Sequence, residues 1–199
     1  TNSIDKTVSI LLGFGDGSFA DQVTYQTGSN PQSVNVGDFN NDARLDLVVA
    51  NYDNHTVSVL LQHKNGSFAN HVTYPTGFNP AAVTVGDFNN DTRLDLVVAN
   101  RAKNTMSILL GIGNGSFMDH VTYTTGVRPV SLAVTDFNND SRLDVVVANF
   151  WGVAVSVLLG FGDGSFADHI LYGTGVFPNA VAVGDFNNDS RPDLVVANS

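Results

Sequence analysis

The chain consists of four copies of one sequence unit, which recurs every 49 residues with no insertion or deletion. The clearest part of the unit is a nine-residue stretch rich in Asp and Asn. It occupies residues 38–46, 87–95, 136–144 and 185–193 and reads DFNNDARLD in its first copy. A repeat of this length decides the fold class, because each unit is a supersecondary motif that buries its apolar residues against its neighbours.

Side-chain oxygens stand at positions 1, 3, 5 and 9 of each stretch, and position 7 is always Arg. A tight loop can turn alternate side chains inward, and the backbone carbonyl of position 7 can join them. Five or six oxygens around one centre suit a calcium ion. The sequence therefore predicts four Ca²⁺ ions, one per repeat, with the Arg side chains pointing outward. The predicted ligands, with Arg acting through its carbonyl, are Asp38, Asn40, Asp42, Arg44, Asp46, Asp87, Asn89, Asp91, Arg93, Asp95, Asp136, Asn138, Asp140, Arg142, Asp144, Asp185, Asn187, Asp189, Arg191 and Asp193.

Loops rich in Asp and Asn are also common as plain turns, since these side chains bond to their own backbone. Four copies that keep every oxygen while position 6 varies favour metal binding over a plain turn. An EF-hand is excluded, because its loop needs a bidentate Glu at position 12. This chain has Val there in all four copies, and a strand-like LDLVVAN follows where an EF-hand has a helix.

The acidity of the chain is local. All 19 acidic residues are Asp, and twelve of them belong to the four loops. Without these twelve the net charge of −10 would be +2, and four bound divalent ions would bring it to −2. This distribution argues for metal and against nucleic acid, which selects a basic face. The chain has no cysteine and no apolar run of membrane-spanning length. Calcium is abundant outside cells, so we expect a secreted or cell-surface protein.

Each repeat contains four short strand patterns and no helical period. In the first cycle they are residues 33–38, 45–50, 56–61 and 69–74, here named A, B, C and D. The A–B connection is the predicted calcium loop. The C–D connection carries a Gly-Ser-Phe turn. In the first copy its Gly forms the pair Asp16-Gly17, which suits a tight turn with positive φ. Tandem four-stranded units of this kind predict an all-β fold, a β-propeller with one blade per repeat, over a single domain of residues 1–199. A stack of β-helix coils is the alternative, although such coils are usually shorter.

The phase of the repeat predicts how the ring closes. The chain opens with strands C and D of one blade, continues through three whole blades, and ends with strands A and B. Pairing the two ends would complete a fourth blade and remove the exposed edges. A closed four-bladed ring is the favoured interpretation, with Val34 and Val36 facing inward. Two further arrangements stay open: a head-to-tail dimer forming an eight-bladed ring, or a segment of a longer array.

The motifs GDFNNDxRxDLVVAN and TVSxLLGxGDGSF closely resemble the FG-GAP/VCBS repeat over the whole chain. This repeat is the calcium-bearing blade of integrin α-chain propellers and of many secreted proteins. The resemblance implies calcium in the A–B hairpin and a role in adhesion, protein recognition or sugar binding. The family loop usually has Gly at positions 4 and 6. Here Asn stands at position 4, and Ala43, Thr92, Ser141 and Ser190 stand at position 6. Asn tolerates left-handed φ, whereas the residues at position 6 are expected to be strained.

Differences between the copies indicate where a partner would bind. The A–B and C–D loops are nearly invariant, whereas the B–C and D–A loops on the opposite face vary. In the integrin-like family this opposite face is also the ligand face. Aromatic residues and Arg are frequent anchors of recognition sites. The alternative is that unconstrained loops simply drift. The predicted ligand face comprises Tyr52, Phe78, Arg101, Arg128, Phe150, Trp151 and Phe177.

No pattern in the sequence predicts catalysis. Every carboxylate cluster has the spacing of a metal loop, and no nucleophile-base set stands out. His71, His120 and His169 recur one blade apart on strand D, so they are expected in solvent and not around one metal. The predicted function is an extracellular calcium-binding module for recognition or adhesion that binds an unknown protein or glycan. A lectin-like propeller and a purely structural spacer are the alternative functions. Neither nucleic-acid binding nor membrane insertion is expected for this chain.

Overall fold

The computed structural model describes residues 1–199, and the chain is built only from strands and their connections. The sixteen strands follow the predicted A, B, C, D cycle, and their ends differ from the predicted ends by at most a few residues. The A strands are β3 (Pro31–Gly37), β7 (Pro80–Gly86), β11 (Pro129–Thr135) and β15 (Pro178–Gly184). The B strands are β4 (Asp46–Asn51), β8 (Asp95–Asn100), β12 (Asp144–Asn149) and β16 (Asp193–Asn198).

The C and D strands complete the cycle and come first in the chain. The C strands are β1 (Thr7–Ile10), β5 (Thr56–Leu60), β9 (Thr105–Leu109) and β13 (Ala154–Leu158). The D strands are β2 (Val23–Gln26), β6 (Val72–Pro75), β10 (Val121–Thr124) and β14 (Ile170–Gly173). The C–D turns form as predicted, since Gly17 has a φ of 92° and its counterparts Gly66, Gly115 and Gly164 also have positive φ.

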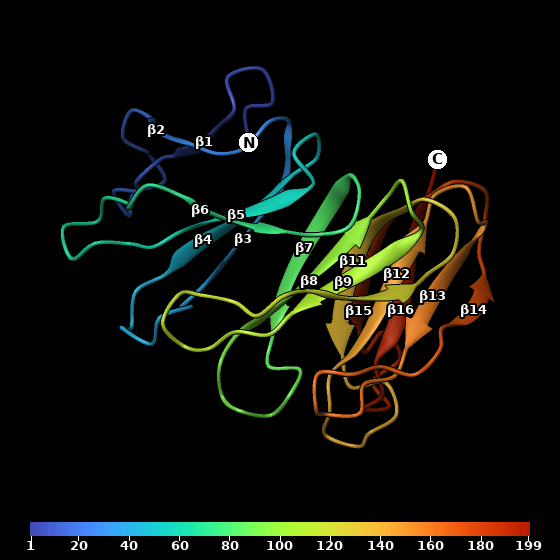
Figure 1. Ribbon diagram of the computed structural model, residues 1–199. Helices are drawn as coiled ribbons and strands as arrows, with labels where there is room; N and C mark the ends of the chain where they lie inside the picture. Colours follow the sequence, from blue (N-terminus) through green and yellow to red (C-terminus); the bar gives the residue numbers. More distant parts are fainter.

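The strands form three complete antiparallel blades and two half-sheets. The blades are β3–β6, β7–β10 and β11–β14, while β1–β2 and β15–β16 stay two-stranded. Figure 1 shows β1–β2 at the upper left and β15–β16 beside the third blade on the right, with the complete blades between the two sides. No helix is long and apolar enough to cross a membrane. The all-β, four-repeat architecture predicted from the sequence is therefore confirmed.

The blades stack through their apolar faces. In the B strands of the complete blades every residue is buried, because these strands have a sheet on both sides. Between the first two blades, Val48, Val57 and Val59 pack against the next sheet. That sheet contributes Val83, Leu96, Val98, Leu109 and Phe117 to the same cluster. Equivalent clusters fill the other interfaces, so each repeat is stabilised by its neighbours in the chain.

The predicted closure of the ring is not formed. β1–β2 and β15–β16 remain separate sheets with no strand pairing between them. No hydrophobic cluster spans the two half-sheets either, so the packing that joins successive blades stops at each end of the row. The ends are therefore exposed: Val195 is 50% exposed, whereas its counterparts Val48, Val97 and Val146 are fully buried. Val34 and Val36 are also exposed, which corrects the expectation that they face inward. The preceding half-sheet lacks the A and B strands that would cover them.

Candidate metal-binding loops and recognition face

The four Asp-rich loops lie between strands A and B, at one edge of the row of blades. The C–D loop of each blade lies on the same face as the A–B loop of the blade before it. Gly115 donates its backbone N–H to the carbonyl of Phe39 at 2.8 Å, and Gly164 does the same to Phe88 at 3.0 Å. The nearly invariant loops of the repeat thus form one continuous face.

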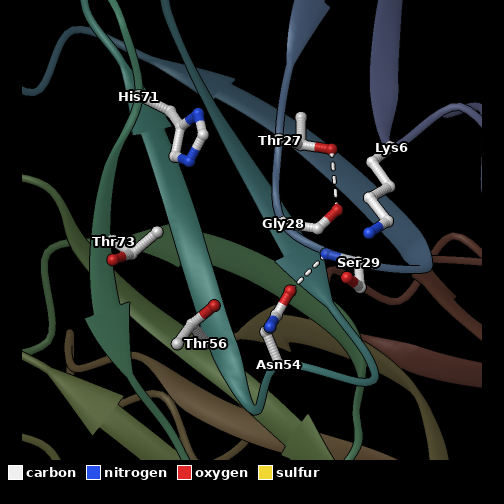
Figure 2. A pocket seen from close by; sticks show the side chains of 8 residues that line it. All are labelled: Lys6, Thr27, Gly28, Ser29, Asn54, Thr56, His71 and Thr73. Atoms are coloured by element: carbon white, nitrogen blue, oxygen red, sulfur yellow. Dashed lines mark hydrogen bonds between the residues drawn. The ribbon is translucent and has the colours of Figure 1, made fainter.

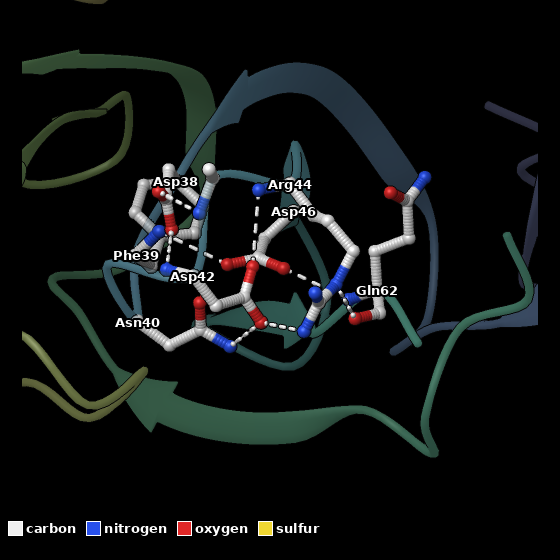
Figure 3. Close-up of polar contacts among 8 residues, drawn as sticks. Asp38, Phe39, Asn40, Asp42, Arg44, Asp46 and Gln62 are labelled. Carbon is white, nitrogen blue, oxygen red and sulfur yellow. Dashed lines mark hydrogen bonds and ion pairs between the residues drawn. The ribbon is translucent and has the colours of Figure 1, made fainter. Parts of the chain in front are cut away.

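The first Asp of each loop organises the loop backbone (Figure 3). One oxygen of the Asp38 carboxylate accepts the N–H of Asp42 at 3.0 Å, and the other accepts that of Ala43 at 2.7 Å. The equivalent pairs of bonds form in the other three copies. The second Asp of the loop, Asp42, accepts the N–H of Arg44 at 3.0 Å. The spacing of the carboxylates therefore stabilises the turn of the loop by itself, whether or not an ion is bound.

The two loop positions where the family has glycine adopt left-handed φ in every copy. Position 4 has φ values of 57–62°, and it is always Asn, which tolerates this conformation. Position 6 has φ values of 63–68° at Ala43, Thr92, Ser141 and Ser190. Thr92 has the largest value, 68°, and it is β-branched, so it is the most strained of the four. The strain expected at position 6 is therefore present in the backbone.

We expect Thr92→Gly to stabilise the chain by about 1 kcal/mol. Relief of a strained left-handed residue contributes about 1–3 kcal/mol, and the extra freedom of glycine in the unfolded chain offsets part of it. Urea unfolding would measure the gain. Thr122→Gly is the control, because Thr122 lies exposed in strand β10, where glycine should cost about 0.5–1 kcal/mol. If both variants were destabilised, Thr92 would not be strained.

The last Asp of the loop is buried and connects three parts of the blade. Asp46 accepts the N–H of Phe39 at 2.9 Å and that of Gln62, just after strand C, at 2.8 Å. Asp95 and Asp144 make the same two bonds in their blades. Burial raises the pKa of Asp95 to about 6. The two N–H donors lower this pKa, and repulsion from the carboxylates of Asp91 and Asp87 raises it further. The sequence predicted this Asp as a ligand but did not indicate that it also joins strand C to the loop.

The loop carboxylates do not converge on one point in this arrangement. No group of three or more Asp, Glu, His or Cys side chains forms a metal cage, because backbone N–H groups hold the carboxylates. The Arg44 side chain does not point outward as predicted. It pairs with the Asp42 carboxylate, and its Nε donates to the Gln62 carbonyl at 3.2 Å. Arg93 and Arg142 likewise lie 3.6 and 3.8 Å from the second Asp of their loops, Asp91 and Asp140. The reason is that the guanidinium offsets the carboxylate charge of its own loop.

Two features of the loop nonetheless fit a hard cation. Every candidate donor is a carboxylate, amide or carbonyl oxygen, which are the ligands that Ca²⁺ prefers. In addition, the amide oxygen of Asn40 in the first loop is buried and has no hydrogen-bond partner, whereas its counterparts in the other loops accept a backbone N–H. A buried oxygen without a donor is costly, and a cation would supply what it lacks. The chemistry of the loop thus suits calcium, and small rotations of the carboxylates would be needed to bind it.

The B–C and D–A connections gather on the opposite face. Backbone bonds join them, as where Tyr52 donates to the Asn30 carbonyl at 3.0 Å and Phe150 to the Arg128 carbonyl at 2.8 Å. A buried Asn at the end of the B strand in each complete blade supports this face, namely Asn51, Asn100 and Asn149. Asn51 accepts the N–H of Gly28 at 3.0 Å and donates to Ser58 Oγ at 2.9 Å. Gly28 is required here, since a Cβ would lie 2.6 Å from Asn51 Cγ. The repeated Asn was not recognised from the sequence, although it appears in every LVVAN or VVVAN.

Most of the predicted ligand-face residues contact one another. The Arg101 guanidinium lies 5.8 Å from the Phe150 ring centre, and Phe150 lies 5.3 Å from Phe177. The Arg128 guanidinium stacks 3.3 Å above the Trp151 ring. These are cation–π contacts, and they hold the guanidinium groups in place while their edges stay available for hydrogen bonds. The other two residues, Phe78 and Tyr52, lie outside these two groups of contacts.

Phe78 and Tyr52 are flanked by other polar groups of the same face. The Phe78 ring lies 4.7 Å from the His55 ring and 5.3 Å from Lys103 Nζ. Tyr52 lines a hollow of about 200 Å³ with Arg101, Asn30 and Gln32. The structure thus places all seven predicted residues in the connections of one face, with three of them in one aromatic and cationic cluster.

The two faces carry opposite charge. The A–B and C–D connections hold seventeen of the nineteen Asp residues against five basic residues. They are the twelve of the A–B loops with Asp16, Asp21, Asp119, Asp163 and Asp168. The other face holds four cations, Lys6, Arg101, Lys103 and Arg128, against Asp5 and Asp53. Ion pairs do not neutralise these four cations, since the three ion pairs of the chain all lie in the A–B loops. An acidic protein therefore presents one weakly basic, aromatic face.

The chain belongs to the FG-GAP-like repeat family. The FG-GAP-like repeat matches residues 2–49, 38–98, 87–147 and 136–196, so it covers nearly the whole sequence in four tandem copies. The family resemblance predicted from the loop and turn motifs is thereby confirmed. No curated protein matches the chain.

Solved structures share the fold at low sequence identity. A functionally unknown protein from Desulfotomaculum acetoxidans is similar with a TM-score of 0.71 and 16% identity, over 98% of this chain and 57% of that one. A lectin from Agrocybe aegerita that recognises non-reducing terminal N-acetylglucosamine matches with a TM-score of 0.63 and 18% identity, over 96% and 55%. BBS1N, in its complex with ARL6DN, matches with a TM-score of 0.57 and 18% identity, over 83% and 50%. The chain thus spans about half the length of these structures.

Proposed function

We propose that the chain is a calcium-binding β-propeller segment that serves as an extracellular recognition or adhesion module. The observation that carries this proposal is the difference in sequence variation and composition between the two faces. One face repeats the same Asp-rich loops four times, whereas the other varies from copy to copy and collects exposed aromatic rings and free cations. Repetition is typical of a structural role, and a composite, non-repeated surface of Arg and aromatic residues is typical of a binding site.

In this proposal calcium is structural, with one ion in each A–B loop. The ion would be held by the oxygens at positions 1, 3, 5 and 9 and by the carbonyl of position 7. Bound calcium supplies positive charge among three carboxylates and fixes a loop that otherwise depends on strained residues. A bound calcium ion would stabilise the A–B hairpin, whose last Asp also bonds to the backbone just after strand C. Millimolar calcium outside cells favours secretion or the cell surface for such a module.

The open ends are proposed to pair with blades of the same kind, completing a closed propeller. Phe19, Phe186 and Val195 are exposed, whereas their counterparts in the other repeats are buried or half-buried. The two half-sheets carry complementary strands, C with D at one end and A with B at the other. Similar solved structures are matched along only about half their length, which supports a ring of more than four blades. A head-to-tail second copy, or further repeats, would supply the missing half.

Binding to arrays of extracellular proteins would test the recognition role. We expect partners whose affinity falls at least tenfold in Trp151→Ala, because exposed Trp and Arg dominate such interfaces. Arg142→Ala is the matched control, since Arg142 lies on the opposite, calcium face. If no partner depended on Trp151, the module would be a spacer whose variable face makes only internal contacts.

A lectin-like function is the second candidate. It is favoured by a fully polar hollow of about 390 Å³ beside the first blade and by the similarity in fold to a lectin. A lectin that repeats its site in each blade would need a recurring aromatic residue, and Trp151 is the only Trp. As a lectin, this chain would be expected to bind one sugar per chain and not one per blade.

A further inference from the structure

A hollow of about 390 Å³ lies on the recognition side, between the N-terminal half-sheet and the first complete blade. Figure 2 shows side chains from four separate segments around it. No hydrophobic side chain and no carboxylate lines it. The lining residues used below are Lys6, Ser29, Asn54, Thr56, His71 and Thr73.

The hollow exists because of one small residue. Ser29 occupies the position that Phe78 holds one repeat later, and the last two copies have Val there. The Phe78 ring lies 4.7 Å from the ring of His55, the counterpart of Lys6. The same ring lies 5.3 Å from the Nζ of Lys103, the counterpart of Asn54. In the second repeat an aromatic ring therefore fills the space that Ser29 leaves open in the first.

The groups that remain free in the hollow are mainly hydrogen-bond donors. The amide oxygen of Asn54 already accepts the N–H of Ser29, and Thr56 Oγ1 accepts from Asn51 at 3.1 Å. The Asn54 amide N–H₂ and the hydroxyl hydrogens of Ser29, Thr56 and Thr73 are left to donate. Lys6 adds an ammonium that belongs to no ion pair of the chain. A donor-rich hollow with a free cation and no carboxylate selects an anion.

We propose that this hollow binds the anionic group of a hydroxyl-rich ligand of monosaccharide size, such as an acidic sugar. Lys6 would pair with the anionic group, while Asn54, Thr56, Thr73 and the imidazole of His71 would bond to the remaining oxygens. The volume is within the range of small-ligand sites, and the lack of apolar lining matches a ligand without an apolar face. This inference rests on the proposed recognition role and names the ligand class of one part of that face.

The test is a titration of the purified chain with glucuronate, glucose and inorganic phosphate, followed by amide chemical shifts in NMR. Glucuronate is expected to shift the resonances of Ser29, Asn54 and Thr56 and to bind at least about tenfold more tightly than glucose, because a charged hydrogen bond is at stake. Phosphate binding that depends on Lys6 would show that a free oxyanion suffices. Binding of glucuronate alone would show that the sugar hydroxyls are also needed. Both results support an anion site.

Matched variants make the result specific. Lys6→Gln should weaken glucuronate binding at least about tenfold. Lys103→Gln removes the same charge from the same face and should leave binding unchanged. Ser29→Phe introduces the residue of the second repeat and should abolish binding, whereas Ser29→Ala should keep it within about threefold. Melting temperatures would confirm that each variant is folded.

Several results would overturn the inference. They are equal affinity for glucose and glucuronate, equal effects of the Lys6 and Lys103 variants, unchanged binding in Ser29→Phe, or no binding of any probe. The Trp151 assay distinguishes this failure from failure of the proposed function. A chain that binds no probe but keeps a Trp151-dependent partner would overturn the anion site alone. Loss of that dependence would overturn the recognition role itself.

Discussion

Asp95→Ala is expected to destabilise the chain by about 3 kcal/mol, even when no calcium is present. The Asp95 carboxylate is fully buried and accepts the backbone N–H of Phe88 at 2.9 Å and that of Gly111 at 2.7 Å. Alanine would leave both donors buried without a partner, at about 1–3 kcal/mol each. Part of this loss is offset, because the buried carboxylate is itself costly, as its raised pKa of about 6 shows. Urea unfolding in the presence of a chelator would measure the difference.

Asp193→Ala is the matched control for this experiment. Asp193 occupies the same loop position in the last repeat, but it accepts only the N–H of Phe186, at 3.0 Å, and strand C is missing from its half-sheet. We expect a loss of about 1 kcal/mol or less there. Equal losses in the two variants would contradict the role of the buried carboxylate in joining the loop to strand C.

The repeat made the blade predictable from sequence. Four aligned copies revealed which positions are fixed, and alternation of apolar residues located A, B, C and D. The B strand illustrates why this worked: a continuous LDLVVA pattern is typical of a strand that is covered on both sides. The strand order, the turns and the family resemblance followed from the same 49-residue period.

Closure and side-chain roles were not predictable from the repeat in the same way. Whether four blades close depends on the rotation between neighbouring sheets, which the volumes of many packed side chains set together. The outward orientation expected for Arg44 was wrong, because the adjacent Asp42 attracts its guanidinium. The hollow at Ser29 depends on a contact between segments of two repeats. A comparison of the repeats could have suggested this hollow, because Ser29 stands where the second repeat has the much larger Phe78.

Removal of calcium is expected to have the largest effect of all. A site filled at a hundred times its dissociation constant adds about 2.7 kcal/mol to the free energy of unfolding. For a chain of this size each site then corresponds to about 5–10 °C in melting temperature. Differential scanning calorimetry with calcium and with a chelator would measure the shift. Magnesium is the control ion, because it is smaller and retains its water more strongly, so it should restore only part of the stability.

Native mass spectrometry would connect this stability to the four loops. We expect four calcium ions per chain, and three in Asp87→Ala, because Asp87 is the first ligand of the second loop and also anchors its backbone through Asp91 and Thr92. Thr122→Ala, on strand β10 away from the loops, should keep all four. Two chains with eight ions would favour the head-to-tail ring, and one chain with four ions would favour completion by other repeats. Four ions in Asp87→Ala would contradict the assignment of Asp87 as a ligand. Equal melting temperatures with calcium and with chelator would rule out structural calcium. The loops would then be held only by their own N–H bonds and by the buried carboxylates that join them to strand C.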